Sequence, residues 1–229
     1  MTVGQFEGKE SMYAQNEKQK ELKTQQIAES ALELFQNHSY FEITMAQIAR
    51  SAGVAKGTLF NYYPTKESIF MDLLLHGYQE YFLAAHSQFD AQKISSLAEL
   101  RQFLLDLTQD LIENRPVVVR LNALRGLVLE KNWIKDQTVR EREKLYHITQ
   151  SLNQAIAEKI STLTAQEVNQ LFFAQSAIIS GLMNLSGLDQ FNHQQLKMEM
   201  KDFHVDLNRQ AQEIYAAYLD GLLLRKGSL

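Results

Sequence analysis

The sequence predicts an all-α protein of about nine helices. Only 2 of the 229 residues are proline, and long stretches favour Leu, Ala, Gln, Glu and Lys, which lose little rotamer freedom in a helix. Apolar residues recur every three or four positions, and we find no alternating strand pattern. Apolar residues make up 45% of the chain and charged residues 22%, the balance of a globular protein that can bury a sizeable core.

Composition also narrows the class of protein. The chain has no cysteine, which excludes disulfides, thiolate nucleophiles and Cys-ligated metal sites and suits a reducing cytoplasm. The N-terminus lacks the pattern of a secretion signal, and no run approaches the ~18–20 apolar residues of a membrane span. We therefore expect a cytoplasmic protein with no membrane partner. The net charge is −4, so composition alone does not indicate a nucleic-acid partner.

The N-terminal segment is expected to begin as an arm and to continue as a helix. Residues 1–17 are polar and contain glycine, which indicates a mobile arm, and Met12 is an alternative start. From about Lys18 we expect a helix that stops near Asn37, because apolar residues then form one stripe. That stripe consists of Ile27, Ala31, Leu34 and Phe35.

Two short helices and a longer one should follow. The Thr44 hydroxyl can cap the first by accepting from free backbone N–H groups, and Gly53 can end it in a left-handed conformation. The second covers residues 55–63, ahead of a proline. Thr65 can cap the third helix, which should run to about Ala85.

Five longer amphipathic segments complete the expected helices. Each carries an apolar stripe at helical spacing, and the second begins with a proline in the favourable first turn. Their approximate ranges are 97–114, 116–128, 145–160, 165–188 and 205–224.

The segment 43–66, ITMAQIARSAGVAKGTLFNYYPTK, is the most informative part of the chain. Two helices of about two turns each, joined through a glycine, are typical of a helix-turn-helix, whose second helix enters the major groove of DNA. Gly57 permits close backbone approach, while Lys56 and Thr58 offer donors to bases or phosphate. The apolar residues that can hold this helix on its support are Leu59 and Phe60. The polar residues on its exit side, where a phosphate strand would run, are Asn61, Tyr62 and Lys66.

This segment closely resembles the DNA-reading motif of the tetracycline-repressor (TetR) family. The shared features are a capping Thr, Ile-Ala, Ala-Gly-Val, Lys-Gly-Thr-Leu, an aromatic residue, a Tyr, another aromatic residue, and Pro before a polar residue, Lys and Glu. The resemblance implies an Ω-shaped homodimer that reads DNA with its first three helices, dimerises through its last two and encloses a small-molecule pocket. It implies that the residues nearest bases or phosphate are Thr44, Ala46, Gln47, Lys56, Gly57 and Thr58. It implies backbone-phosphate contacts for Phe60, Asn61, Tyr62 and Lys66.

The second helix departs from the family pattern. Ala46 and Gln47 stand where several relatives place a basic residue, so base readout should rest on Gln47, Lys56 and Thr58, with weaker phosphate anchoring. The lysines of the preceding segment could compensate by following the minor groove or the backbone. These are Lys18, Lys20 and Lys23.

The C-terminal half suggests an interface and a cavity. Two adjacent apolar helices at a chain end are what a two-fold four-helix interface needs. The expected interface residues are Ile178, Leu182, Leu185, Leu207, Ala211, Ile214, Tyr218 and Leu222. Ring and amide groups on the middle helices fit an apolar pocket with a few polar groups. The expected pocket residues are Phe82, His86, Phe103, Asn122, Trp133, Tyr146 and Gln175.

We thus predict three parts: an arm (1–17), a helix-turn-helix DNA-binding domain (18–66) and a ligand-binding and dimerisation domain (67–229). The expected function is that of a repressor released from a palindromic double-stranded DNA operator by an unidentified small molecule. A ligand-independent DNA-binding or nucleoid-associated protein of the same fold is the alternative. An enzyme is disfavoured because the chain lacks G-x-S-x-G, P-loop and H-E-x-x-H motifs. No cofactor and no metal site are expected.

Overall fold

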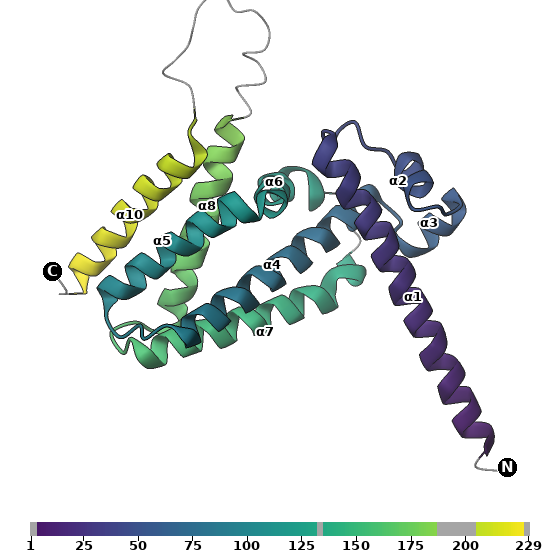
Figure 1. Cartoon of the computed structure of the whole chain (residues 1–229), viewed down its shortest axis with the longest axis horizontal. Helices are drawn as coiled ribbons and strands as arrows, with labels where there is room; N and C mark the ends of the chain where they lie inside the picture. The colour runs from purple at the N-terminus through teal and green to yellow at the C-terminus, as the bar shows by residue number, and fades with distance from the viewer. Residues whose placement is uncertain (1–3, 132–134, 187–204, 227–229) are drawn as a thin grey trace, which may run out of the picture.

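A computed structural model describes residues 4–131, 135–186 and 205–226, and these ranges contain nine α-helices, one π-helical segment and no strand (Figure 1). The all-α prediction is confirmed. The elements are α1 (Gly4–Asn37), α2 (Met45–Ser51), α3 (Lys56–Tyr62), α4 (Lys66–Ala91), α5 (Leu97–Asn114), α6 (Pro116–Leu124), η1 (Arg125–Leu129), α7 (Lys135–Lys159), α8 (Ala165–Ser186) and α10 (Leu207–Arg225).

The head of the molecule, which we define as α2, α3 and the C-terminal half of α1, forms one end of a continuous hydrophobic core. The predicted stripe of α1 supplies Ile27, Ala31 and Phe35, all fully or almost fully buried. Ile48 from α2 and Leu59 from α3 are buried as well. This apolar contact holds two short helices that would not be stable alone.

The turn between α2 and α3 follows the sequence prediction. Gly53 adopts φ 61°, the left-handed conformation that glycine reaches without steric cost. The Gln26 side chain donates from Nε2 to the Ala52 carbonyl at 2.8 Å. The turn is therefore fixed both by its own backbone and by α1.

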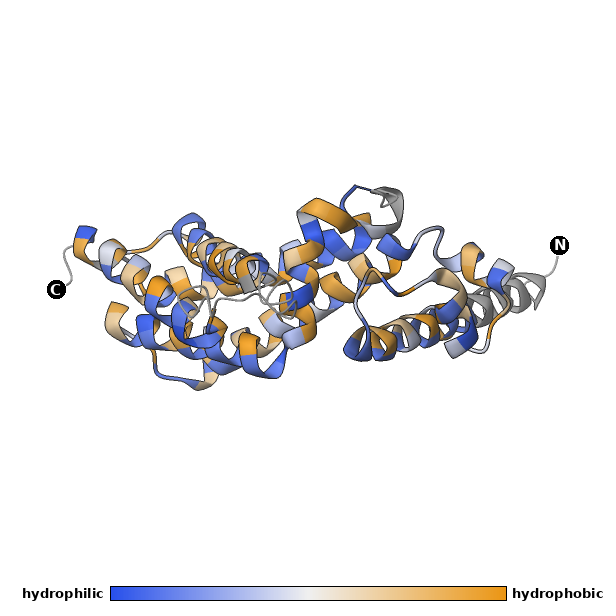
Figure 2. Ribbon diagram, turned by 90° about the horizontal axis from the view of Figure 1, so that it is seen from above, coloured by the Kyte–Doolittle hydropathy of each residue, from blue (hydrophilic) through white to orange (hydrophobic). Residues whose placement is uncertain are grey.

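The remaining helices form an elongated body beside the head. Helix α4 leads out of the head and packs along α7, while α8 packs against α6, α7 and α10, and α10 also packs against α5 (Figure 1). Figure 2 shows hydrophobic and hydrophilic residues on different sides of the same helices, as amphipathic packing requires. No helix in the described ranges is long and apolar enough to cross a membrane.

Several helix boundaries differ from the predicted ones. Helix α1 begins at Gly4, so residues 4–17 are helical and continuous with the helix that was expected to start near Lys18. This segment contains three Glu, two Gln and one Lys and lacks proline, so a helix is compatible with its composition even without an apolar stripe to reveal it. The mobility of this extension stays a prediction.

The other differences lie in the body. Helix α4 continues to Ala91, six residues beyond the predicted end, and α7 begins at Lys135, about ten residues before the predicted apolar stripe. Helix α6 stops at Leu124 and gives way to the π-helical segment η1. A single inserted residue shifts the helical register there, which a 3.6-residue pattern cannot indicate.

Candidate nucleic-acid interface

The first helix of the motif is held by a capping box. The Thr44 hydroxyl accepts from the Gln47 backbone N–H at 3.3 Å, and Gln47 Oε1 accepts from the Thr44 backbone N–H at 2.8 Å. The Thr44 hydroxyl also donates to Gln47 Oε1 at 2.7 Å. The predicted cap is confirmed, but the Gln47 carbonyl oxygen is engaged in it. A bidentate contact from Gln47 to adenine would require this cap to open.

Both motif helices leave one side exposed. On α2 the exposed residues include Ala46, Gln47 and Arg50, which are spaced along one side of the helix. On α3 they are Lys56, Gly57, Phe60 and Asn61. These exposed residues on α2 and α3 are called the reading surface below. It includes six of the predicted DNA-binding residues.

Other predicted residues play different parts. Leu59 is fully buried and holds α3 on the head, while Phe60 is 41% exposed, so only one of the two expected support residues acts as support. Thr58 and Tyr62 are half-buried at the flank of α3. Arg50 was not predicted as a DNA contact, although its position next to the apolar pair Ile48-Ala49 of α2 already placed it on the outer side of that helix.

Lys66 differs from the residues of the reading surface because its ammonium group is hydrogen-bonded within the protein. Its Nζ donates to the carbonyls of Tyr40 and Ile43, each at 2.8 Å, and lies 4.1 Å from the centroid of the Tyr40 ring. Burial lowers the pKa of this ammonium group. The geometry gives Lys66 a structural role, in which it ties the loop before α2 to the start of α4, and its expected phosphate contact stays a prediction.

Two tyrosines connect the head to α4 as well. The Tyr63 hydroxyl donates to Asp72 at 2.6 Å, and the Tyr40 hydroxyl donates to Glu67 at 2.9 Å. Burial, assisted by these carboxylates, raises the pKa of both phenols, so they stay protonated donors. Because Tyr63 directly follows α3, the orientation of that helix is coupled to α4.

Comparison with known families identifies the family to which this helical arrangement belongs. Residues 27–73 match the model of bacterial regulatory proteins of the tetR family, and residues 90–226 match the tetracyclin repressor-like C-terminal domain. The second match alone covers more than half of the chain. The protein belongs to the TetR family. It is accordingly a bacterial regulatory protein with a family-typical C-terminal domain.

Similar proteins include other TetR-type regulators. The chain is 32% identical over 127 residues to the mycofactocin biosynthesis transcriptional regulator MftR of Mycobacterium tuberculosis, covering 55% of this chain and 50% of that protein. It is 39% identical over 56 residues to the fatty acid metabolism regulator protein of Bacillus subtilis, covering 24% of this chain and 29% of that one. The matches thus span half or less of these relatives. The structure of Thermus thermophilus FadR with lauroyl-CoA shares the fold, with a TM-score of 0.56, 19% identity and coverage of 88% and 93%.

The structure brings some of the predicted pocket residues together. Phe82 packs edge-on against Phe172, with ring centroids 5.3 Å apart. Gln175, on the same helix as Phe172, accepts from the Tyr81 hydroxyl at 3.0 Å and donates to Thr108 at 2.8 Å. These contacts join α4, α5 and α8.

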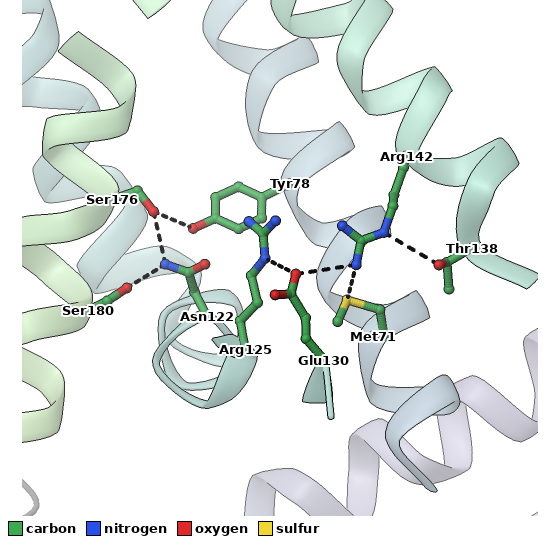
Figure 3. Close-up of polar contacts among 9 residues, drawn as sticks. All are labelled: Met71, Tyr78, Asn122, Arg125, Glu130, Thr138, Arg142, Ser176 and Ser180. Carbon is green, nitrogen blue, oxygen red and sulfur yellow. Dashed lines mark hydrogen bonds and ion pairs between the residues drawn. The ribbon is translucent and has the colours of Figure 1, made fainter. Parts of the chain in front are cut away.

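Asn122 belongs to a neighbouring polar cluster, shown in Figure 3. Its Nδ2 donates to the hydroxyls of Ser176 and Ser180 on α8, at 3.0 and 2.5 Å. The Tyr78 hydroxyl of α4 lies 3.4 Å from the Ser176 hydroxyl. We call Tyr78, Asn122, Ser176 and Ser180 the polar cluster.

The other predicted pocket residues lie elsewhere. Tyr146 is 59% exposed on α7, Phe103 packs against Phe89 with ring centroids 5.6 Å apart, and His86 is half-buried beside Asp90 on its own helix. Tyr146 faces outward, which corrects its assignment to an internal pocket. Trp133 falls outside the described residues.

An ion cluster beside η1 was not predicted. Glu130 Oε1 lies 3.0 Å from Arg125 Nε and 3.4 Å from an Arg142 nitrogen (Figure 3). Burial acts to raise the pKa of Glu130, but the hydrogen bonds and charges of the two arginines outweigh it and lower that pKa. Arg125 is the first residue of the five-residue π-helical segment, Glu130 directly follows that segment, and Arg142 comes from α7.

The expected dimer residues divide between the core and the surface. Leu182 and Ala211 are buried inside the protomer, at 8% and 0% exposure, which corrects their assignment. Leu185 and Ile214 are exposed, and the half-buried remainder are Ile178, Leu207, Tyr218 and Leu222. Other apolar and small residues of these two helices are exposed and recur every three, four or seven positions. We call them the apolar face. They are Phe173, Ala177, Gly181 and Leu185 on α8, and Ile214, Ala217 and Leu224 on α10.

Proposed function

We propose that this TetR-family regulator is a homodimeric repressor whose two reading surfaces bind successive major grooves of a near-palindromic operator. The reading surface is the observation that carries the proposal, because it presents backbone, amide and cationic groups on a short helix pair braced by α1 and α4. Half-sites separated by about 34–36 Å, or somewhat more, follow from the helical repeat of B-DNA. Repression then comes from occlusion of the promoter.

The apolar face supports the dimer. Phe173 is 69% exposed and Ile214 is 47% exposed, on two helices that pack against each other. Gly181 has no neighbouring heavy atom within 4 Å of an added Cβ, so a partner helix can approach closely there. Exposed apolar residues gathered on adjacent helices are typical of an interface rather than of a solvated surface.

For the effector we propose a fatty acyl thioester. Buried aromatic residues within α4 and α8 supply an apolar surface that suits an aliphatic chain, with the Phe82 ring between those of Tyr78 and Phe172. The polar cluster adjoins this surface and offers donors to a thioester or amide, and Arg125 on η1 offers a cation for phosphate. The B. subtilis relative is named for fatty acid metabolism, and the T. thermophilus structure contains lauroyl-CoA.

A combined binding experiment tests the proposal. Operator fragments are first selected with the purified protein from random or genomic duplexes. Lauroyl-CoA, coenzyme A alone and lauric acid are then compared for thermal stabilisation and for operator release. We expect lauroyl-CoA to raise the thermal stability and to release the operator. A ligand that binds only the folded protein stabilises it by mass action. A ligand that prefers the DNA-free conformation shifts the protein towards that conformation.

Matched variants localise the effect. Asn122→Leu should weaken the response to lauroyl-CoA, whereas Tyr146→Ala, at the exposed position on α7, should leave it unchanged. Operator binding without any response to acyl thioesters would remove the proposed effector. Stabilisation by no compound of a broad metabolite panel would favour a ligand-independent DNA-binding protein of the same fold.

A further inference from the structure

The outer side of α3 carries an aromatic ring that the head does not use. Leu59 is buried and supports the helix, while the next residue, Phe60, is 41% exposed. At 100° per residue, Lys56, Phe60, Gly57 and Asn61 fall within one arc of about 140°, whose centre lies about 130° around the helix from Leu59. Phe60 therefore lies within the reading surface, between a cation and an amide.

The surroundings of Phe60 leave its ring open to an apolar partner. Lys56 Nζ lies 5.9 Å from the ring centroid, at the outer limit of a cation–π contact. An added Cβ at Gly57 would meet no heavy atom within 4 Å, so this side of the helix is unobstructed. A backbone or base edge can thus approach α3 closely next to the ring.

The chemistry of the ring limits what it can bind on DNA. A phenyl group has no hydrogen-bond donor, so Phe60 cannot donate a hydrogen bond to the backbone phosphate that the sequence resemblance placed near it. In the major groove the apolar group presented by a base pair is the C5-methyl of thymine, which aromatic and aliphatic side chains contact.

We propose that Phe60 is a specificity-determining residue that recognises a thymine by its C5-methyl group in each half-site. The proposal rests on the proposed function, because it needs α3 in the major groove. It assigns Phe60 to base readout instead of phosphate contact. The operator should accordingly contain at least one thymine per half-site whose C5-methyl group contributes to binding.

The test removes only the methyl group. Each thymine of the selected operator is replaced in turn by deoxyuridine, and binding is measured by fluorescence anisotropy with the full-length wild-type protein and with Phe60→Ala. We expect one replacement per half-site to weaken wild-type binding about three- to fivefold, the effect of one buried methyl group. Phe60→Ala should bind the thymine operator more weakly and should no longer distinguish it from the deoxyuridine operator.

Two further variants keep the result interpretable. Phe60→Leu retains an apolar side chain and should retain part of the discrimination, whereas Phe41→Ala, at a 72% exposed aromatic outside α3, should retain all of it. Equal wild-type affinity for every deoxyuridine operator would overturn this inference and leave the proposed function standing. A methyl effect that persists in full in Phe60→Ala would also overturn it. Failure of the wild-type protein to bind any duplex selectively would overturn both this inference and the proposed function.

Discussion

Gly77 of α4 and Val118 of α6 meet so closely that only glycine fits: a Cβ added at Gly77 would lie 2.5 Å from Val118 Cγ2. Helix α4 leads directly from the head, and α6 carries Asn122 of the polar cluster. This contact therefore joins the element that positions α3 to the element that faces the proposed effector site. Packed contacts of this kind transmit small displacements because the interior is not freely deformable.

Gly77→Ala should force α4 and α6 apart. Overpacking of this kind costs about 1–3 kcal/mol of the free energy of unfolding, measured by urea denaturation. Val118→Ala in the same chain should recover most of that loss because it removes the clashing methyl groups. Gly126→Ala is the matched control, since its Cβ would meet no neighbour, and it should change stability little. Equal costs at positions 77 and 126 would contradict the close-contact explanation.

Arg120 gives α6 a second connection, this time to α1. Its guanidinium carbon lies 4.1 Å from the centroid of the buried Phe35 ring, and a terminal nitrogen lies 3.5 Å from the His38 carbonyl. Arg120→Met should remove about 0.5–2 kcal/mol of this attraction and increase amide hydrogen exchange at the end of α1. Arg140→Met, at an exposed position of α7, should leave that exchange unaltered.

The two lysines of the motif should differ in their salt dependence. Lys56→Met should lower the slope of log affinity against log salt by about 2, because each of the two protomers of the dimer loses one phosphate contact. Lys66→Met should leave that slope unchanged but destabilise the head by about 1–3 kcal/mol, since the Tyr40 and Ile43 carbonyls lose their donor. A reduced slope for Lys66→Met would confirm its predicted role at phosphate.

A charge placed on the apolar face should separate the protomers. Phe173→Glu is expected to sediment as a folded monomer and to lose most of its operator affinity, because two half-sites are then no longer bound together. Tyr146→Glu changes another exposed aromatic residue, on α7, and should stay dimeric. Analytical ultracentrifugation distinguishes the two, and a dimeric Phe173→Glu protein would place the interface elsewhere.

Acid should abolish the contribution of Glu130. Its pKa is lowered in the folded state, so its stabilising effect is present above the ordinary glutamate pKa of about 4.3 and is lost as the pH falls through the lowered value. The side chain is about a third exposed, which screens the interaction to about 0.5–1 kcal/mol. The stability difference between wild type and Glu130→Gln should therefore vanish at low pH. A difference that grows as the pH falls would contradict the assigned ion pairs.

The head was predictable because its determinants are local. The Thr44 cap, the Gly53 turn and the burial of Leu59 each follow from a residue type at a fixed offset, and all three are found in the structure. The part taken by Lys66 was not predictable in this way. Its acceptors are backbone carbonyls 23 and 26 residues away, and a basic residue near a DNA-binding helix reads as a phosphate contact until its partners are known.

The C-terminal half was less predictable because its helices are apolar on more than one side. On α8, Leu182 faces the protomer core while Leu185, three residues later, is exposed, and a hydrophobic stripe alone does not distinguish the two. The polar cluster depends on three helices that meet only in the folded chain, and η1 changes register within a segment of ordinary helical composition.

The central claim is that the reading surface binds a duplex, and anisotropy titration of the selected operator tests it most directly. Lys56→Ala/Asn61→Ala changes two exposed side chains and should leave thermal unfolding unaltered. We expect this variant to bind the operator at least about a hundredfold more weakly than the wild type, since both protomers lose two contacts to bases or phosphate. Equal operator affinity of variant and wild type would contradict the account.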